Sequence, residues 1–114
     1  MDSASSIAMS GMLAATQRLN VAARNIANSN TDLATDAAAE AAKAFRPLRA
    51  DQTEAPSGGT AVTVHAQLPN DAFSGIDLAS EASQLVTARY TFAANVAVMR
   101  AAAQMQKVLL DTSA

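Results

Sequence analysis

Apolar residues recur at intervals of seven in a segment near the start of the chain, residues 6–29. One line holds large side chains, at Met12, Leu19 and Ile26. The line beside it holds only alanines: Ala8, Ala15 and Ala22. A seven-residue repeat is typical of helices that pack lengthwise against one another. We therefore predict a helix here, roughly 36 Å long at 1.5 Å per residue.

A second segment, residues 77–111, keeps the same interval for longer. One line runs through Leu78, Leu85, Phe92, Met99 and Gln106, and its companion runs through Ala82, Arg89, Val96, Ala103 and Leu110. Asp77 is the expected N-cap, and the helix would span roughly 50 Å. Six large residues of the two segments are expected to form the core between the helices: Leu19, Ile26, Leu85, Phe92, Val96 and Met99.

The residues between these segments have a different character. Residues 32–44 are rich in alanine with alternating charge, which fits a helix, a frayed extension or a mobile loop. Residues 45–50 (FRPLRA) and 60–66 (TAVTVHA) flank the bend 56–59 (PSGG), so a short β-hairpin is expected within 45–66. Because a two-stranded hairpin is marginal alone, it must lean on a helix or on a neighbouring chain.

The pattern as a whole predicts a mainly α fold. Long N- and C-terminal helices would pair as an antiparallel, coiled-coil-like hairpin, with a small β-hairpin or loop region between them. We expect an N-terminal helix in 1–31, a middle region in 32–76 and a C-terminal helix in 77–114. The two terminal segments would together form one helical core domain.

Composition changes this picture in one respect. Alanine makes up about a quarter of the 114 residues, aromatic residues are 4%, and there is no Trp. Alanine favours helix but buries little apolar area, at roughly 25 cal/mol per Å². The core of a single chain would therefore be thin, and we expect the helices to complete their burial against other chains.

Charge and chemistry exclude several classes of function. The net charge is −2 and no basic stripe is present, so nucleic acid is not an expected partner. No apolar run approaches the ~18 residues of a membrane-spanning helix. His65 is the only histidine and there is no Cys. We therefore expect no catalytic residue, cofactor, metal or small-molecule substrate, and no enzyme activity. Because the first basic residue is Arg18, a cleaved signal peptide is not expected either.

Asparagine is concentrated where the first helix should end. Asn25, Asn28 and Asn30 lie within six positions. One asparagine can close a helix in the left-handed conformation, as expected for Asn28 or Asn30. Three exceed what a cap needs, so we expect amides that bond to specific partners.

Both terminal segments resemble bacterial flagellar basal-body rod proteins, within the wider family of rod, hook and axial proteins. The first segment is MLAATQRLNVAARNIANSNT at 12–31, with its Arg-Leu pair and the run Asn-Ile-Ala-Asn. The second is IDLASEASQLVTARYTFAANVAVMRAAAQMQKVLLD at 76–111, with the block Ala88, Arg89, Phe92, Ala94 and Asn95. The short middle region is most similar to the proximal-rod FlgC type.

The resemblance implies a structural subunit of the proximal rod. Such subunits polymerise helically with copies of themselves and with other rod proteins. They form the drive shaft and export channel in the periplasmic part of the basal body, which they reach through the flagellar type III export apparatus. On this basis we expect the following residues to make polar contacts between subunits: Asn25, Asn28, Asn30, Arg89 and Asn95. The alternative is a soluble coiled-coil adaptor or export chaperone that binds a partner helix in the cytoplasm.

Overall fold

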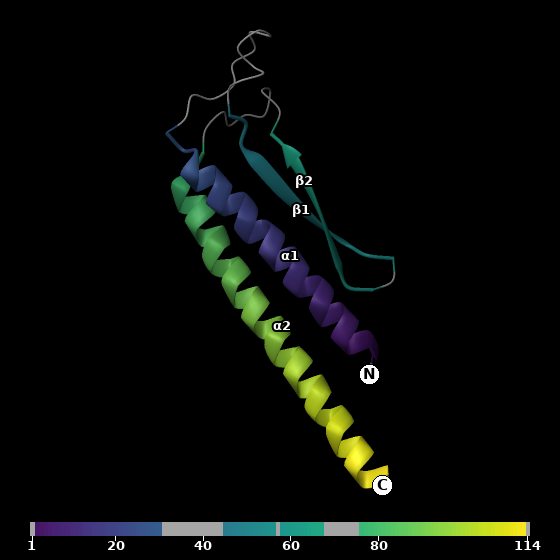
Figure 1. Ribbon diagram of the computed structural model, residues 1–114. Helices are drawn as coiled ribbons and strands as arrows, with labels where there is room; N and C mark the ends of the chain where they lie inside the picture. Colours follow the sequence, from purple (N-terminus) through teal and green to yellow (C-terminus); the bar gives the residue numbers. More distant parts are fainter. Residues whose placement is uncertain (1, 31–44, 57, 68–75, 114) are drawn as a thin grey trace.

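The computed structural model describes residues 2–30, 45–56, 58–67 and 76–113. Its elements are helix α1 (Asp2–Ala27), strands β1 (Leu48–Glu54) and β2 (Thr60–Ala66), and helix α2 (Leu78–Ser113). The molecule is elongated, with extents of 69 × 27 × 21 Å. The predicted fold class is confirmed: two long helices lie side by side and a two-stranded antiparallel hairpin joins them in sequence (Figure 1). The segment 32–44, for which three conformations were considered, lies outside the described residues.

Helices α1 and α2 run antiparallel, and the hairpin lies along α1 (Figure 1). In the part of the chain that the structure describes, the buried apolar residues are alanines with one exception, a valine: Ala8, Ala14, Ala15, Val21, Ala22, Ala88 and Ala102. Five of them, which we call the alanine seam, lie at multiples of seven residues along the two helices: Ala8, Ala15, Ala22, Ala88 and Ala102. Small side chains allow two helix backbones to approach closely.

The structure differs from the expected core of large side chains. Leu19 is 37% exposed and Phe92 is 42% exposed. The other four residues of that set are only half-buried: Ile26, Leu85, Val96 and Met99. The reason is the alanine seam itself, because alanines occupy the centre of the contact and leave the large side chains beside it.

The helix ends follow different rules. The predicted cap of α2 is confirmed, since Oδ1 of Asp77 accepts from the backbone N–H groups of Ala79 (3.0 Å) and Ser80 (3.3 Å). At the end of α1 the expected left-handed asparagine is wrong, because no non-glycine residue in the described ranges has a positive φ. The chain there stays right-handed, with the Asn28 N–H donating to the Arg24 carbonyl at 3.1 Å.

The hairpin pairs Leu48 with Ala66 at its base and Glu54 with Thr60 near its tip. The predicted hairpin is confirmed, and β1 continues through residues 51–54, which the sequence pattern did not assign to a strand. Gly58 and Gly59 have φ values of 81° and 94°, a conformation that glycine adopts without strain. The glycines therefore account for the position of the bend.

Candidate subunit interface

A buried asparagine joins three elements at one end of the helix pair. Asn25 of α1 is 1% exposed. Its Nδ2 donates to the Leu48 carbonyl of β1 and to Oε1 of Glu81 in α2, both at 2.8 Å. Its Oδ1 accepts from the Leu48 N–H at 2.9 Å. The amide thus pairs with the edge of β1 as a neighbouring strand would, and it uses both of its N–H hydrogens.

This geometry gives Asn25 a role within the subunit. Both of its donors are satisfied within the chain and its side chain is 1% exposed, so the contact with another subunit that was expected from the sequence stays a prediction. The cluster of amides did indicate specific hydrogen bonding at this helix end. Leu48 and Glu81 lie 23 and 56 residues away, so local sequence carried no sign of them.

A second contact fixes the far end of the hairpin to α1. Oγ of Ser10 donates to the Ile7 carbonyl at 2.7 Å and accepts from the Thr60 N–H at 3.0 Å. A Cβ on Gly59 would collide with the Ser10 side chain, so only glycine permits this approach. The hairpin is therefore held to α1 at both ends. Sequence analysis missed Ser10 because an isolated serine in a helix carries no distinctive pattern.

A third contact brings the two helices together near their middle. A Cβ added to Gly11 would lie 2.7 Å from Oδ1 and Nδ2 of Asn95, so the Asn95 side chain lies directly over the glycine. Nδ2 of Asn95 also donates to the Thr91 carbonyl at 2.9 Å. Asn95, expected at a subunit contact, is thus half-buried inside the helix pair of its own chain.

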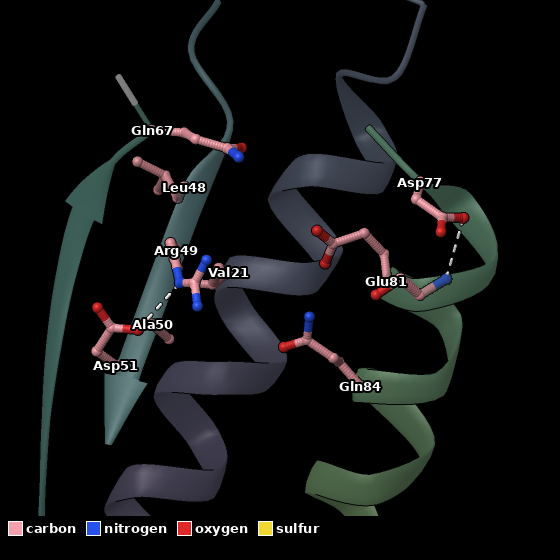
Figure 2. A pocket seen from close by; sticks show the side chains of 10 residues that line it. Val21, Leu48, Arg49, Ala50, Asp51, Gln67, Asp77, Glu81 and Gln84 are labelled. Atoms are coloured by element: carbon pink, nitrogen blue, oxygen red, sulfur yellow. Dashed lines mark hydrogen bonds and ion pairs between the residues drawn. The ribbon is translucent and has the colours of Figure 1, made fainter. Parts of the chain in front are cut away.

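A polar recess of about 370 Å³ lies between β1, α1 and the start of α2 (Figure 2). Arg49 is turned toward Asp51, with Nε 3.1 Å from Oδ1. Glu81 and Gln84 project from α2 on the opposite side (Figure 2). Oε2 of Glu81 is buried and has no hydrogen-bond partner among the described residues, which makes Glu81 the least satisfied polar group here. Sequence reasoning did not single it out.

The only histidine lies on the hairpin and is not among the residues that line this recess. Nε2 of His65 is 3.4 Å from Oδ2 of Asp51 on the neighbouring strand, and both side chains are about half exposed. Within the described ranges, no three side chains of the metal-binding types gather closely enough to hold an ion. The arrangement around His65 is that of an exposed cross-strand pair.

The remaining residues expected at the interface lie on the surface or at the end of α1. Nδ2 of Asn28 donates to the Arg24 carbonyl at 2.8 Å, and the side chain is half-buried. Asn30 and Arg89 are exposed. Their contacts with a second subunit stay predictions.

Large apolar side chains are more abundant on the surface than in the core. The following are exposed along the two helices: Ile7, Met9, Leu13, Leu19, Leu78, Val86, Tyr90, Phe92, Val98, Met105, Val108, Leu109 and Leu110. Large apolar side chains left exposed in such number along two helices mark a candidate binding surface. The surfaces of both helices are therefore the candidate interface.

Neither helix has, in its described part, a stretch long and apolar enough to cross a membrane.

Comparison with known proteins gives one match. No curated protein matches the chain. A family model described as flagella basal body rod protein matches residues 6–32, most of α1 with its asparagine-rich end, and this similarity supports a structural role in the flagellar rod.

Proposed function

We propose that this chain is a structural subunit of the proximal rod of the bacterial flagellum, of FlgC type. It polymerises helically with copies of itself and with other rod proteins, and the polymer encloses the export channel and transmits torque. The observation that carries the proposal is the distribution of apolar side chains, with alanines inside and large residues outside. The similarity of residues 6–32 to flagellar rod proteins supports it.

The geometry suits a load-bearing subunit. Two helices in close contact form a stiff rod, and the hairpin braces α1 through Asn25 at one end and Ser10 at the other. A shaft subunit must also present different surfaces to successive neighbours, because a contact that does not close into a ring generates a helical filament. The exposed apolar residues of α1 and α2 provide such surfaces along most of the molecule.

Polar residues on the outside would set the register between subunits. Asn30 and Arg89 are exposed, and Asn28 lies two positions before Asn30 at the end of α1. Amide and guanidinium groups at an apolar contact select one geometry, because a misplaced subunit leaves them without partners. Export through the flagellar type III apparatus would deliver the chain to the growing rod.

Purified basal bodies provide the test. A strain that produces the chain with a short epitope in the hairpin bend should yield basal bodies that bind the antibody along the rod. Deletion of the gene should leave basal bodies without a complete rod and cells that do not swim. If the labelled chain is found only in the cytoplasmic fraction, bound to an export substrate, the alternative of an adaptor or chaperone is correct instead.

A further inference from the structure

The antiparallel register leaves the end of α2 without cover from α1. Asn25 is bonded to Glu81, and Gly11 lies under Asn95. These two contacts place the first residues of α1 beside the part of α2 near Gln104. The last turns of α2, roughly 13 Å of helix, continue past the end of α1 (Figure 1).

The uncovered end has the character of an interface. Three residues, which we call the tail patch, are exposed there: Met105, Val108 and Leu109. Val108 is 64% exposed and Leu109 is 54% exposed. Together with Ala101 and Gln104 they line an open, mostly apolar hollow of about 520 Å³. An apolar hollow at the tip of an elongated molecule is costly to leave in water.

The tail patch continues the interface that already exists between the helices. Ala88 and Ala102 are buried by α1, and Leu109 occupies the next position in the same seven-residue series. The pattern of a packed helix thus extends one repeat beyond the partner that this chain supplies. A helical surface of the same kind, from another molecule, is what this repeat is suited to contact.

The chain itself carries a complementary surface. Leu19, Leu78 and Phe92, which we call the flank, are large and partly exposed, and all three lie on the seven-residue lines beside the alanine seam. The helix pair covers only part of each of these side chains and leaves the rest exposed. The tail patch lies near the end of α2, whereas Leu78 is the first residue of that helix. The two surfaces therefore sit apart on each molecule and cannot satisfy one another within it.

We infer that the tail patch of one copy of this chain packs against the flank of a second copy, head to tail. The contact is heterologous, so each molecule uses its tail patch on one neighbour and its flank on another, and the series can continue. The inference rests on the proposed function, because it names the contact through which the subunits would add along the shaft. The partner is a second copy of this chain, and the tail patch meets the flank and not another tail patch.

Cysteine cross-linking tests whether the tail patch of one copy meets the flank of another. The natural chain has no cysteine, so each introduced cysteine is the only one in its chain. Full-length Val108→Cys is mixed with full-length Leu78→Cys carrying a mass tag, and the mixture is oxidised gently. The mixed disulfide should form at least about tenfold faster than either homodimer, as expected for a preformed contact. Ala97→Cys mixed with Leu78→Cys is the control, since Ala97 is exposed on α2 and belongs neither to the tail patch, nor to the flank, nor to the exposed large apolar residues.

A charge substitution tests the same contact without a covalent bond. Val108→Asp should weaken self-association by about tenfold in sedimentation equilibrium, whereas Ala97→Asp should change it little. Circular dichroism of both variants checks that α2 is intact. No excess of mixed disulfide up to the solubility limit, or preferential Val108–Val108 dimers, would overturn the inference.

These outcomes are separable from those for the proposed function. If the chain is found in basal bodies but the mixed disulfide does not exceed the control, the rod function stands and this contact is wrong. If the mixed disulfide forms but the chain is absent from basal bodies, the contact stands and the rod function is wrong.

Discussion

The inside and the flank of the helix pair use the same seven-residue repeat for different purposes. Inside, Ala8, Ala15 and Ala22 are almost completely buried although each has only a methyl side chain. On the flank, Leu19 and Phe92 are large and remain 37% and 42% exposed. The small residues determine how closely the helices approach, and the large residues are left to contact something else. Burial within this chain and apolar bulk are therefore separated in space.

The same comparison applies to polar groups. Asn25 is buried and its two donors are satisfied inside the chain, whereas Asn30 and Arg89 are exposed. Polar residues on the inside therefore stabilise the subunit, and those on the outside are available to neighbours. Substitutions on the two sides should separate stability from assembly.

The largest effect on stability is expected for Asn25→Ala. It removes three hydrogen bonds and leaves the part-buried Leu48 N–H without its partner, so the free energy of unfolding should fall by about 3 kcal/mol. Urea unfolding followed by circular dichroism measures it. Asn20→Ala is the control, because Asn20 is exposed on the same helix and the change should be neutral or slightly stabilising. Equal stabilities of the two variants would contradict the role given to Asn25.

A somewhat smaller loss is expected for Ala22→Leu. Ala22 is completely buried in the alanine seam, and the added carbons must push the helices apart, which should cost about 2 kcal/mol. The neighbouring Ala23 is exposed, so Ala23→Leu adds the same side chain without entering the seam. Thermal unfolding of the two variants compares them directly. If both melt like the natural chain, close helix contact is not what the alanines provide.

The smallest effect on the isolated chain is expected for Leu19→Gln. Because Leu19 is already partly exposed, the free energy of unfolding should change by only about 0.5 kcal/mol. Swimming in soft agar should nevertheless be reduced, since the flank would lose an apolar contact with the next subunit. A strain that swims normally with this substitution would show that the flank is not an assembly surface.

The elements of the fold could be predicted from the sequence because each has a local cause. The seven-residue repeat indicated both helices, Asp77 indicated where α2 begins, and the PSGG bend between valine-rich and mixed segments indicated the hairpin. The line of the repeat that is buried was not predictable. In α1 the buried line holds Ala8, Ala15 and Ala22 and not the large residues, and in α2 the buried Ala88 and Ala102 lie on neither of the two lines that the sequence pattern indicated. Only the way in which the two helices pack decides which line is covered.

The contacts of the site could be predicted only in kind. The amide cluster indicated specific hydrogen bonds, yet the partners of Asn25 come from segments that the chain brings back from far away. Ser10, Gly11 and Gly59 each act through a close approach between two elements. A close approach is a property of the folded arrangement, so a single serine or glycine in the sequence does not indicate it.

Gly11 has a mechanical consequence. The helices touch there under the Asn95 side chain, and the remaining 18 residues of α2 extend roughly 27 Å beyond that point. A tilt of about 5° at such a fulcrum would displace the tip of α2 by about 2 Å over that length. The absence of one methyl group near the middle of the molecule, together with the packing of Ala8 and Ala102 beyond it, thus influences where its far extremity points.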